Sequence, residues 1–353
     1  MHIKCSLEVL QASFQLPFEV YGELADSTEI IGLTGTSNPN PSSIVYLKNN
    51  EYFKELEYFF QSSQLKNNVI FTSKNIWNDS LKTLLADSTK SDFKVFVFDK
   101  IELAFCHLTE FWYKKVYENV QSEMDGRKLG NVEVHPTSRI APNVFIGENV
   151  VIEEDVQISP GCFIGANCHI GKNTIFYPNV TLYPFVKVGA NCRLHSGGVI
   201  GSDGFGYYYE GGIHHKIWHF GGVIIGNHVE IGANSCIDSG TFSPTLVGDG
   251  TKIDNQVHIG HNTILGKGVI LCGHVGTSGS CKVGDYTVIG GKAGLAPSCS
   301  VGAQSQIAGG AMVTKNWPER SILGGHPARN LSEWMKTNAL LNRIIAEKTK
   351  KPV

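Results

Sequence analysis

Residues 140–170 read IAPNVFIGENVVIEEDVQISPGCFIGANCHI, with an isoleucine at every sixth position. Large apolar residues continue this spacing to Ile200, and a second series with the same spacing runs from Val247 to Val313. Thr277 is the one position of the second series without a large apolar side chain. A six-residue period fits neither an α-helix nor an isolated strand. It is typical of a parallel β-helix, in which each hexapeptide forms one short strand and a turn.

The period also predicts which residues lie close together in space. Three hexapeptides make one triangular coil, so residues 18 apart in the sequence are expected to stack on neighbouring coils. Aliphatic side chains of successive coils then fill the interior. Polar side chains between them face outward or into clefts.

Residues 1–130 lack the six-residue period and are expected to form a separate α/β domain. Apolar runs predict strands, and amphipathic spacing predicts helices. The strands are expected at Asn68–Phe71 and Lys94–Phe98, and the helices at Glu51–Phe60 and Ile101–Val120.

The rest of the chain divides into a solenoid and a tail. The β-helix domain is expected over residues 131–320, after a linker at 126–131, and a C-terminal extension over 321–353. Residues Leu331–Lys348 have the pattern of an amphipathic helix with a basic end. Such a tail is expected to cap the solenoid, and the alternative is that it packs on a partner.

Two breaks interrupt the period. Residues 201–222 are rich in Gly and aromatic residues, and their length predicts an excursion from the coil. Val247 follows Ile237 at a spacing of ten residues instead of six, so residues 238–246 are expected to bulge. Loops on a rigid scaffold are common positions for binding residues.

Composition excludes several classes of protein. The net charge is −2, which does not suggest a nucleic-acid binder. No run of 18 apolar residues suggests a membrane span, and no basic and apolar N-terminal pattern suggests a signal peptide. We therefore expect a cytoplasmic protein.

The nine cysteines include no CxxC pair. Five of them stand two residues before a repeat position, where a corner has room for only a small side chain. We expect free thiols that act as small core residues at Cys162, Cys168, Cys192, Cys281 and Cys299.

One coil concentrates polar residues. Residues 252–262 read KIDNQVHIGHN, in which Asp254, His258 and His261 face outward if Ile253 and Ile259 fill the core. Gly279 lies 18 residues after His261 and is therefore expected to stack on it. An imidazole can accept a proton from an attacking amine or hydroxyl, and a backbone N–H can stabilise the oxyanion that forms. This pairing suits acyl transfer.

A metal site is the alternative interpretation of the same histidines. His258, His261 and His274 become neighbours once the coils stack, and neutral imidazoles are common zinc ligands. No carboxylate or cysteine completes an ordered ligand spacing, so we expect no metal.

Four segments resemble one enzyme family, the UDP-3-O-acylglucosamine N-acyltransferases of lipid A biosynthesis. The similarity spans nearly the whole chain. The segments are GSDGFGY at 201–207, VEIGAN with IDSG at 229–240, KIDNQV with HN at 252–262, and IVYLKNNEY at 44–52.

The resemblance implies a fold, a reaction and partners. The fold is mainly β, a left-handed parallel β-helix with an N-terminal α/β uridine-binding domain and a C-terminal helix. The reaction transfers a 3-hydroxyacyl chain from the phosphopantetheine of acyl carrier protein to the 2-amine of UDP-3-O-acylglucosamine, with no permanently bound cofactor. The partners implied are acyl carrier protein and, as is common among left-handed β-helices of this period, two further copies of the chain in a homotrimer.

The resemblance also assigns residues. It makes His261 the catalytic base and Gly279 the oxyanion donor. An aromatic face for uracil and an amide for its edge make physical sense, although both tyrosines would otherwise fit a protein core. The substrate-binding residues expected here are Tyr46, Asn49, Tyr52, Asp254, His258, Asn262, His274, Ser298 and Met312, the last at a position that limits chain length in relatives.

The chain departs from the family at two positions of the site. Ser298 stands where the family often has a second histidine, and Ser239 stands where it has an arginine. Two other functions stay open from the sequence. One is an acetyl-CoA-dependent N-acetyltransferase acting on a nucleotide sugar, and the other is a β-helix scaffold without catalytic activity.

Overall fold

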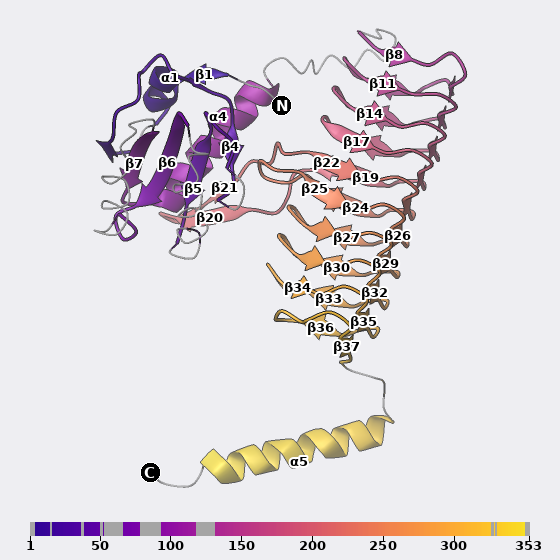
Figure 1. Cartoon of the computed structure of the whole chain (residues 1–353). Helices are drawn as coiled ribbons and strands as arrows, with labels where there is room; N and C mark the ends of the chain where they lie inside the picture. Colours follow the sequence, from indigo (N-terminus) through magenta and orange to yellow (C-terminus); the bar gives the residue numbers. More distant parts are fainter. Residues whose placement is uncertain are drawn as a thin grey trace.

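The N-terminal part of the chain is built around one mixed sheet. The computed structural model describes residues 4–14, 16–36, 39–49, 52, 66–77, 93–117, 131–325, 328 and 330–349. The five-stranded sheet has the order β2-β7-β6-β5-β4, and helix α4 packs against its buried aromatic residues (Figure 1). The elements are β1 (Cys5–Ser6), α1 (Leu7–Ala12), β2 (Phe18–Tyr21), β3 (Glu29–Ile30), β4 (Leu33–Thr34), β5 (Ile44–Leu47), β6 (Asn68–Ser73), β7 (Phe93–Phe98) and α4 (Ile101–Tyr117).

The sequence predictions for this part agree with the elements that the structure describes. Strands β6 and β7 occupy the two predicted positions, and α4 begins at the predicted residue. The predicted helix at Glu51–Phe60 lies outside the described residues except for Tyr52, and so does most of the predicted linker. The boundary between residues 130 and 131 therefore stays a prediction.

The second part is a left-handed β-helix with three flat faces. Each face is one parallel sheet, and strands of successive coils pair with residues 18 apart, such as Ile146 with Ile164. The stacking predicted from the period is therefore confirmed. The apolar series forms one continuous buried core, and Thr277 joins it because its hydroxyl accepts the Gly260 N–H at 3.1 Å.

The first face carries the candidate site. Its strands are β10 (Phe145–Ile146), β13 (Phe163–Ile164), β16 (Thr181–Leu182), β19 (Val199–Ser202), β24 (Cys236–Asp238), β27 (His258–Ile259), β30 (Gly276–Thr277), β33 (Gly294–Leu295) and β36 (Met312–Val313).

The other two faces complete the triangle. The second consists of β8 (Glu133–Val134), β11 (Val151–Ile152), β14 (His169–Ile170), β17 (Val186–Val188), β22 (Val223–Ile225), β25 (Thr245–Val247), β28 (Ile264–Leu265), β31 (Lys282–Val283) and β34 (Ser300–Val301). The third consists of β9 (Arg139–Ile140), β12 (Gln157–Ile158), β15 (Ile175–Phe176), β18 (Arg193–Leu194), β23 (Glu230–Ile231), β26 (Lys252–Ile253), β29 (Ile270–Leu271), β32 (Val288–Ile289), β35 (Gln306–Ile307) and β37 (Ile322–Leu323).

The corners explain the residues that recur between the strands. Most turns hold one residue with φ near +60°, and many of these are asparagines such as Asn143, Asn149 and Asn167. A short polar side chain tolerates the left-handed conformation better than a bulky one. The predicted small-residue slot is also confirmed, because all five cysteines named above are buried free thiols. Cys162 and Thr174 each donate a side-chain hydrogen bond to a carbonyl 15 residues ahead, which ties one coil to the next.

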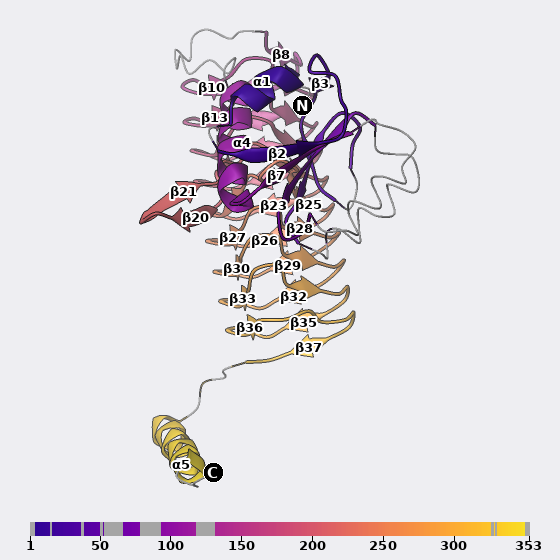
Figure 2. The same ribbon diagram turned by 90° about the vertical axis from the view of Figure 1, so that its left-hand side faces the viewer.

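Both breaks in the period leave the coil as predicted. The first forms an antiparallel hairpin of β20 (Tyr207–Glu210) and β21 (Ile213–Lys216), which extends from the β-helix to helix α4 (Figures 1 and 2). Lys100 beside α4 pairs with Glu210 of the hairpin. The second break is a loop between β24 and β25. The N-terminal part therefore lies beside the coils that carry both breaks.

Helix α5 (Leu331–Thr349) lies beyond the last coil, away from the β-helix (Figure 1). Its apolar residues, including Leu331 and Trp334, are exposed. The expectation that the tail caps the solenoid is therefore wrong, because α5 covers none of the last coil. Within the described residues, no helix has the length and apolar character needed to cross a membrane.

Candidate active site

A cavity of about 820 Å³ opens on the first face between the coils of β24 and β36. Of the predicted residues, it brings together His258, His261, His274, Gly279, Ser298 and Met312. The exposed ring of Phe205, from the first excursion, stands at its edge. Residues that are up to 107 positions apart, from Phe205 to Met312, thus line one space.

A groove runs along the floor of this cavity. His258, Gly276, Gly294 and Met312 stand in register on successive strands. A methyl group added at Gly276 would meet no atom within 4 Å, whereas one added at Gly294 would lie 2.9 Å from Met312 Cε. Two glycines therefore leave a channel open below His258, and the flexible Met312 side chain folds over its far end.

His261 lies directly against Gly279. A methyl group at Gly279 would lie 2.4 Å from His261 Nε2, so only glycine lets the imidazole occupy this place. The Gly279 N–H makes no hydrogen bond within the described part of the chain. The site therefore holds a ring nitrogen and an available backbone donor side by side.

The hydrogen bonds of Asn262 determine the tautomer of His261. Asn262 Oδ1 accepts the Thr241 N–H at 3.0 Å, and Asn262 Nδ2 donates to the Ser243 carbonyl at 3.1 Å. These two bonds fix which end of the amide is the oxygen. The same oxygen lies 3.0 Å from His261 Nδ1, so Nδ1 must carry the proton in the neutral ring. Nε2, the atom beside Gly279, keeps its lone pair free.

A buried carboxylate also lines the cavity. Asp238 is 6% exposed, and its Oδ2 lies 3.7 Å from His258 Nε2. Burial raises the pKa of the Asp238 carboxyl, and electrostatic attraction to His258 when that ring is protonated opposes this effect. The pair presents a polar, hydrogen-bonding wall to whatever occupies the cavity.

Not every predicted residue lines this space. Asp254 is exposed, and its carboxylate accepts the Asn255 N–H outside the cavity. Asn262 has its amide occupied by the bonds described above. Ser239, at the position where related sequences have arginine, is buried. Its hydroxyl accepts the Gly222 N–H at 2.9 Å, and this bond connects the end of the first excursion to the coil.

The predicted uridine residues lie in the N-terminal part, away from this cavity. Tyr46 is half-buried in β5, and its ring stacks on Phe105 of α4 with centroids 4.1 Å apart. Burial raises the pKa of the Tyr46 hydroxyl. Asn49 Oδ1 accepts the Tyr52 N–H at 3.0 Å, and Tyr52 is exposed. One face of the Tyr46 ring is therefore already covered by the protein.

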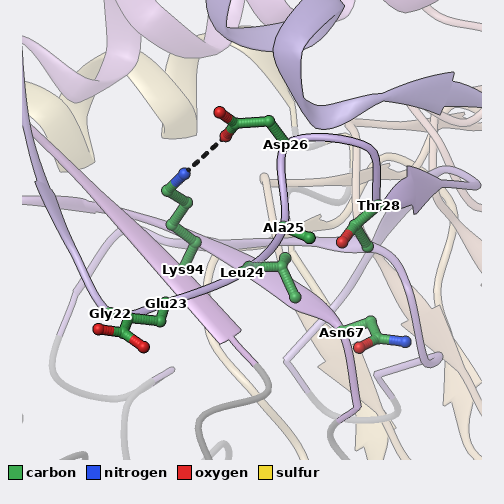
Figure 3. Close-up of a pocket in the computed structure, with 8 residues that line it drawn as sticks. All are labelled: Gly22, Glu23, Leu24, Ala25, Asp26, Thr28, Asn67 and Lys94. Carbon is green, nitrogen blue, oxygen red and sulfur yellow. Dashed lines mark hydrogen bonds and ion pairs between the residues drawn. The ribbon is translucent and has the colours of Figure 1, made fainter.

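A second hollow of about 680 Å³ lies beside β7 and does not contain these residues. Lys94 reaches from the strand to Asp26 in the loop above, where the two charges are 3.1 Å apart (Figure 3). It is the one basic side chain among the described residues that line the hollow, and it is already paired. The hollow is poorly suited to a nucleotide diphosphate.

Two residues of the site had no predicted role. Asp238 stands where the second break begins and within the IDSG segment that resembles the family, and these were its two signals in the sequence. His219 ends the basic and aromatic run HHKIWH at 214–219, and its ring lies 4.8 Å from that of His261. Side chains of His, Cys, Asp and Glu in the described ranges form no group of three or more that could hold a metal.

The comparisons with known proteins agree with this fold. A family model described as bacterial transferase hexapeptide (six repeats) matches residues 137–171 and 167–202. Over 343 residues, the chain is 34% identical to UDP-3-O-acylglucosamine N-acyltransferase of Helicobacter hepaticus, covering 97% of this chain and 98% of that protein. It is 51% identical to UDP-3-O-acylglucosamine N-acyltransferase 2 of Legionella pneumophila (strain Lens) over 161 residues, which is 46% of this chain and about half (47%) of that relative.

A solved structure of Francisella novicida UDP-N-acetylglucosamine acyltransferase is 29% identical, covers 59% of this chain and 71% of its own, and has a TM-score of 0.44. Fold and repeats place the chain among the hexapeptide-repeat acyltransferases. The nearly full-length match identifies it further: the chain belongs to the UDP-3-O-acylglucosamine N-acyltransferase family.

Proposed function

We propose that the protein is an N-acyltransferase of lipid A biosynthesis that acylates the 2-amine of UDP-3-O-acylglucosamine. His261 Nε2 takes a proton from the amine as the nitrogen attacks the thioester carbonyl. The Gly279 N–H binds the oxyanion of the tetrahedral intermediate. When the intermediate collapses, the C–S bond breaks, the proton held on His261 Nε2 passes to the departing sulfur, and the carrier protein leaves as a thiol. The observation that carries this proposal is the His261 tautomer, which leaves Nε2 free beside an unoccupied backbone donor.

The test is a matched pair of histidine substitutions. His261→Asn removes the base, and His228→Asn changes an exposed histidine at a corner outside the cavity. General base catalysis contributes about 10²- to 10⁴-fold, so we expect a loss of that size in kcat for His261→Asn only. Near-normal acyl transfer by folded His261→Asn would refute the mechanism, whereas absence of acyl transfer by the folded wild-type protein would favour a non-catalytic scaffold.

We propose a 3-hydroxyacyl group on acyl carrier protein as the donor. The groove over Gly276 and Gly294 supports this choice, because acetyl-CoA would leave it empty. Comparing turnover with hydroxyacyl carrier protein and with acetyl-CoA separates the two donors. Preferred use of acetyl-CoA would show that the chain is a nucleotide-sugar N-acetyltransferase.

Tyr46, Asn49 and Tyr52 are proposed to bind the uracil. Since Phe105 covers one face of Tyr46, the base would meet the other face or the edge of this ring. Tyr52→Ala should raise KM for the nucleotide substrate and leave kcat nearly unchanged. The homotrimer is part of the same proposal, and light scattering of the full chain tests it.

A further inference from the structure

His219 is a buried histidine whose ring nitrogens make no hydrogen bond of good geometry within the described part of the chain. Its side chain is 1% exposed, and neither ring nitrogen has a polar partner among the described residues. Buried polar groups are usually paired, so this exception needs an explanation. Because neither nitrogen has a hydrogen bond of good geometry among these residues, the main contribution of His219 is the contact surface of its ring.

That surface meets the imidazole of His261. The two rings are 4.8 Å apart at an interplanar angle of 61°, an edge-to-face contact. The hydrogen bond from His261 Nδ1 to Asn262 fixes one atom of the reacting ring, but a ring held at one atom can still swing about it. A second ring against its flank blocks that swing.

The backbone of the first excursion packs closely against both rings. A methyl group at Gly204 would lie 2.5 Å from His261 Cβ and 2.8 Å from His219 Nε2. One at Gly206 would lie 3.1 Å from His219 Cε1. The excursion therefore passes so close to both histidines that neither ring has room to turn away on this side.

The segment that carries His219 is anchored on both sides. Before it, the Trp218 N–H donates to Thr109 Oγ1 of α4 at 3.3 Å, and the Trp218 ring packs on Tyr113 of the same helix. After it, Phe220 is buried in the apolar cluster of the N-terminal part, and its N–H donates to the Thr241 carbonyl at 2.9 Å. His219 is thus held against the β-helix by a helix of the other domain.

His219 also stays uncharged beside a proton acceptor. Burial, together with repulsion from His261 when it is protonated and from Lys216, lowers the pKa of His219 to about 3, and a contact with the Ile217 backbone opposes this shift. A neutral neighbour neither competes for the proton that reaches His261 nor repels the imidazolium.

From these contacts we propose that His219 is a positioning residue for acyl transfer. Its ring, carried by the first excursion and anchored on α4, holds the His261 imidazole with Nε2 directed at Gly279. This inference rests on the proposed role of His261 as the base.

The test asks whether a flat ring at position 219 or only an apolar side chain of similar size is needed, and it uses the full-length protein. His219→Phe keeps a flat ring without nitrogens, and His219→Leu keeps apolar bulk without a flat ring. We measure kcat, KM and melting temperature for both, and for His219→Leu combined with His261→Asn. A displacement of the base by about 1 Å costs on the order of 10²-fold, so His219→Leu should lose about tenfold to hundredfold in kcat with KM unchanged. His219→Phe should retain most of the activity.

The double variant shows whether His219 acts through His261. If it does, His219→Leu causes no further loss once His261 is replaced. Wild-type kcat in folded His219→Leu would overturn the proposal, and so would a His219→Phe variant as slow as His219→Leu, since the nitrogens would then be what matters. If the leucine variant does not fold, the phenylalanine variant still decides. An active His261→Asn variant would instead refute the proposed role of His261 as the base, on which this inference rests.

Discussion

The amide of Asn262 offers the sharpest test of how this site is built. Its oxygen accepts from His261 Nδ1, from the Thr241 N–H and from the Thr241 hydroxyl, and its nitrogen donates to the Ser243 carbonyl. Replacing Asn262 by leucine removes all of these bonds at once. The reacting imidazole then loses both its tautomer preference and one of its two supports.

The magnitude follows from the bond to His261. A hydrogen bond to a group that becomes charged is worth about 1.5–3 kcal/mol. Each 1.4 kcal/mol of lost transition-state stabilisation is about tenfold in rate, so Asn262→Leu should lose roughly tenfold to hundredfold in kcat. It should also lose about 1–3 kcal/mol of stability, because the buried Thr241 N–H is left without a partner.

Two further variants make the assay specific. Asn262 has φ +58°, where leucine is strained, and Asn234→Leu places the same residue at φ +57° in an exposed corner outside the cavity. Its kcat should match wild type. Asn262→Asp keeps an oxygen that can accept from Nδ1, and its negative charge favours the protonated imidazole. The acidic limb of its pH–rate profile should therefore move to higher pH.

The assay is steady-state kinetics with hydroxyacyl carrier protein across a pH series, normalised to folded protein. Wild-type kcat in Asn262→Leu would refute the argument that this amide orients the base. An Asn262→Asp profile identical to wild type would show that the residue does not contact the titrating group.

Three further outcomes are expected. Gly279→Ala puts a methyl group 2.4 Å from His261 Nε2 and should lower kcat about a hundredfold while KM stays similar, and an active variant would contradict the packing described here. The pKa of His219 falls from its ordinary 6.5 to about 3 on folding. Between these two pKa values the unfolded chain binds a proton at His219 and the folded chain does not. The free energy of unfolding should therefore fall by up to roughly 5 kcal/mol as the pH drops from 6.5 to about 3. In urea unfolding, the stability of His219→Phe should lack this dependence on pH. An equal change of unfolding free energy with pH in His219→Phe and in the wild type would disprove the prediction. Gly276→Val fills the open groove and should shift the products toward shorter acyl chains in mass spectra from a mixed carrier-protein pool. An unchanged product distribution would show that the acyl chain binds elsewhere.

Much of this architecture could be predicted from local patterns. A repeat of six with coils of 18 sets the pairing register, so the neighbours of His261 follow from counting along the chain. That is why Gly279 could be placed beside His261 before the structure was known. The cysteines in the corner slot follow in the same way, because each coil repeats the same local environment.

No sequence repeat predicts the contacts between the N-terminal part of the chain and the β-helix. The period ends where the first excursion begins, so nothing in the sequence shows that His219 would return to the flank of His261 or that Trp218 would anchor on α4. The role of Asn262 was also hidden, since its partners Thr241 and Ser243 lie in the second break.

The sequence by itself therefore determined the β-helix, its register and the pairing of His261 with Gly279, because a regular repeat turns separation along the chain into position in space. Only the tertiary structure decided which nitrogen of His261 is free and what holds its ring. Those features depend on irregular loops packed between two domains, where burial and hydrogen-bond partners come from distant parts of the chain.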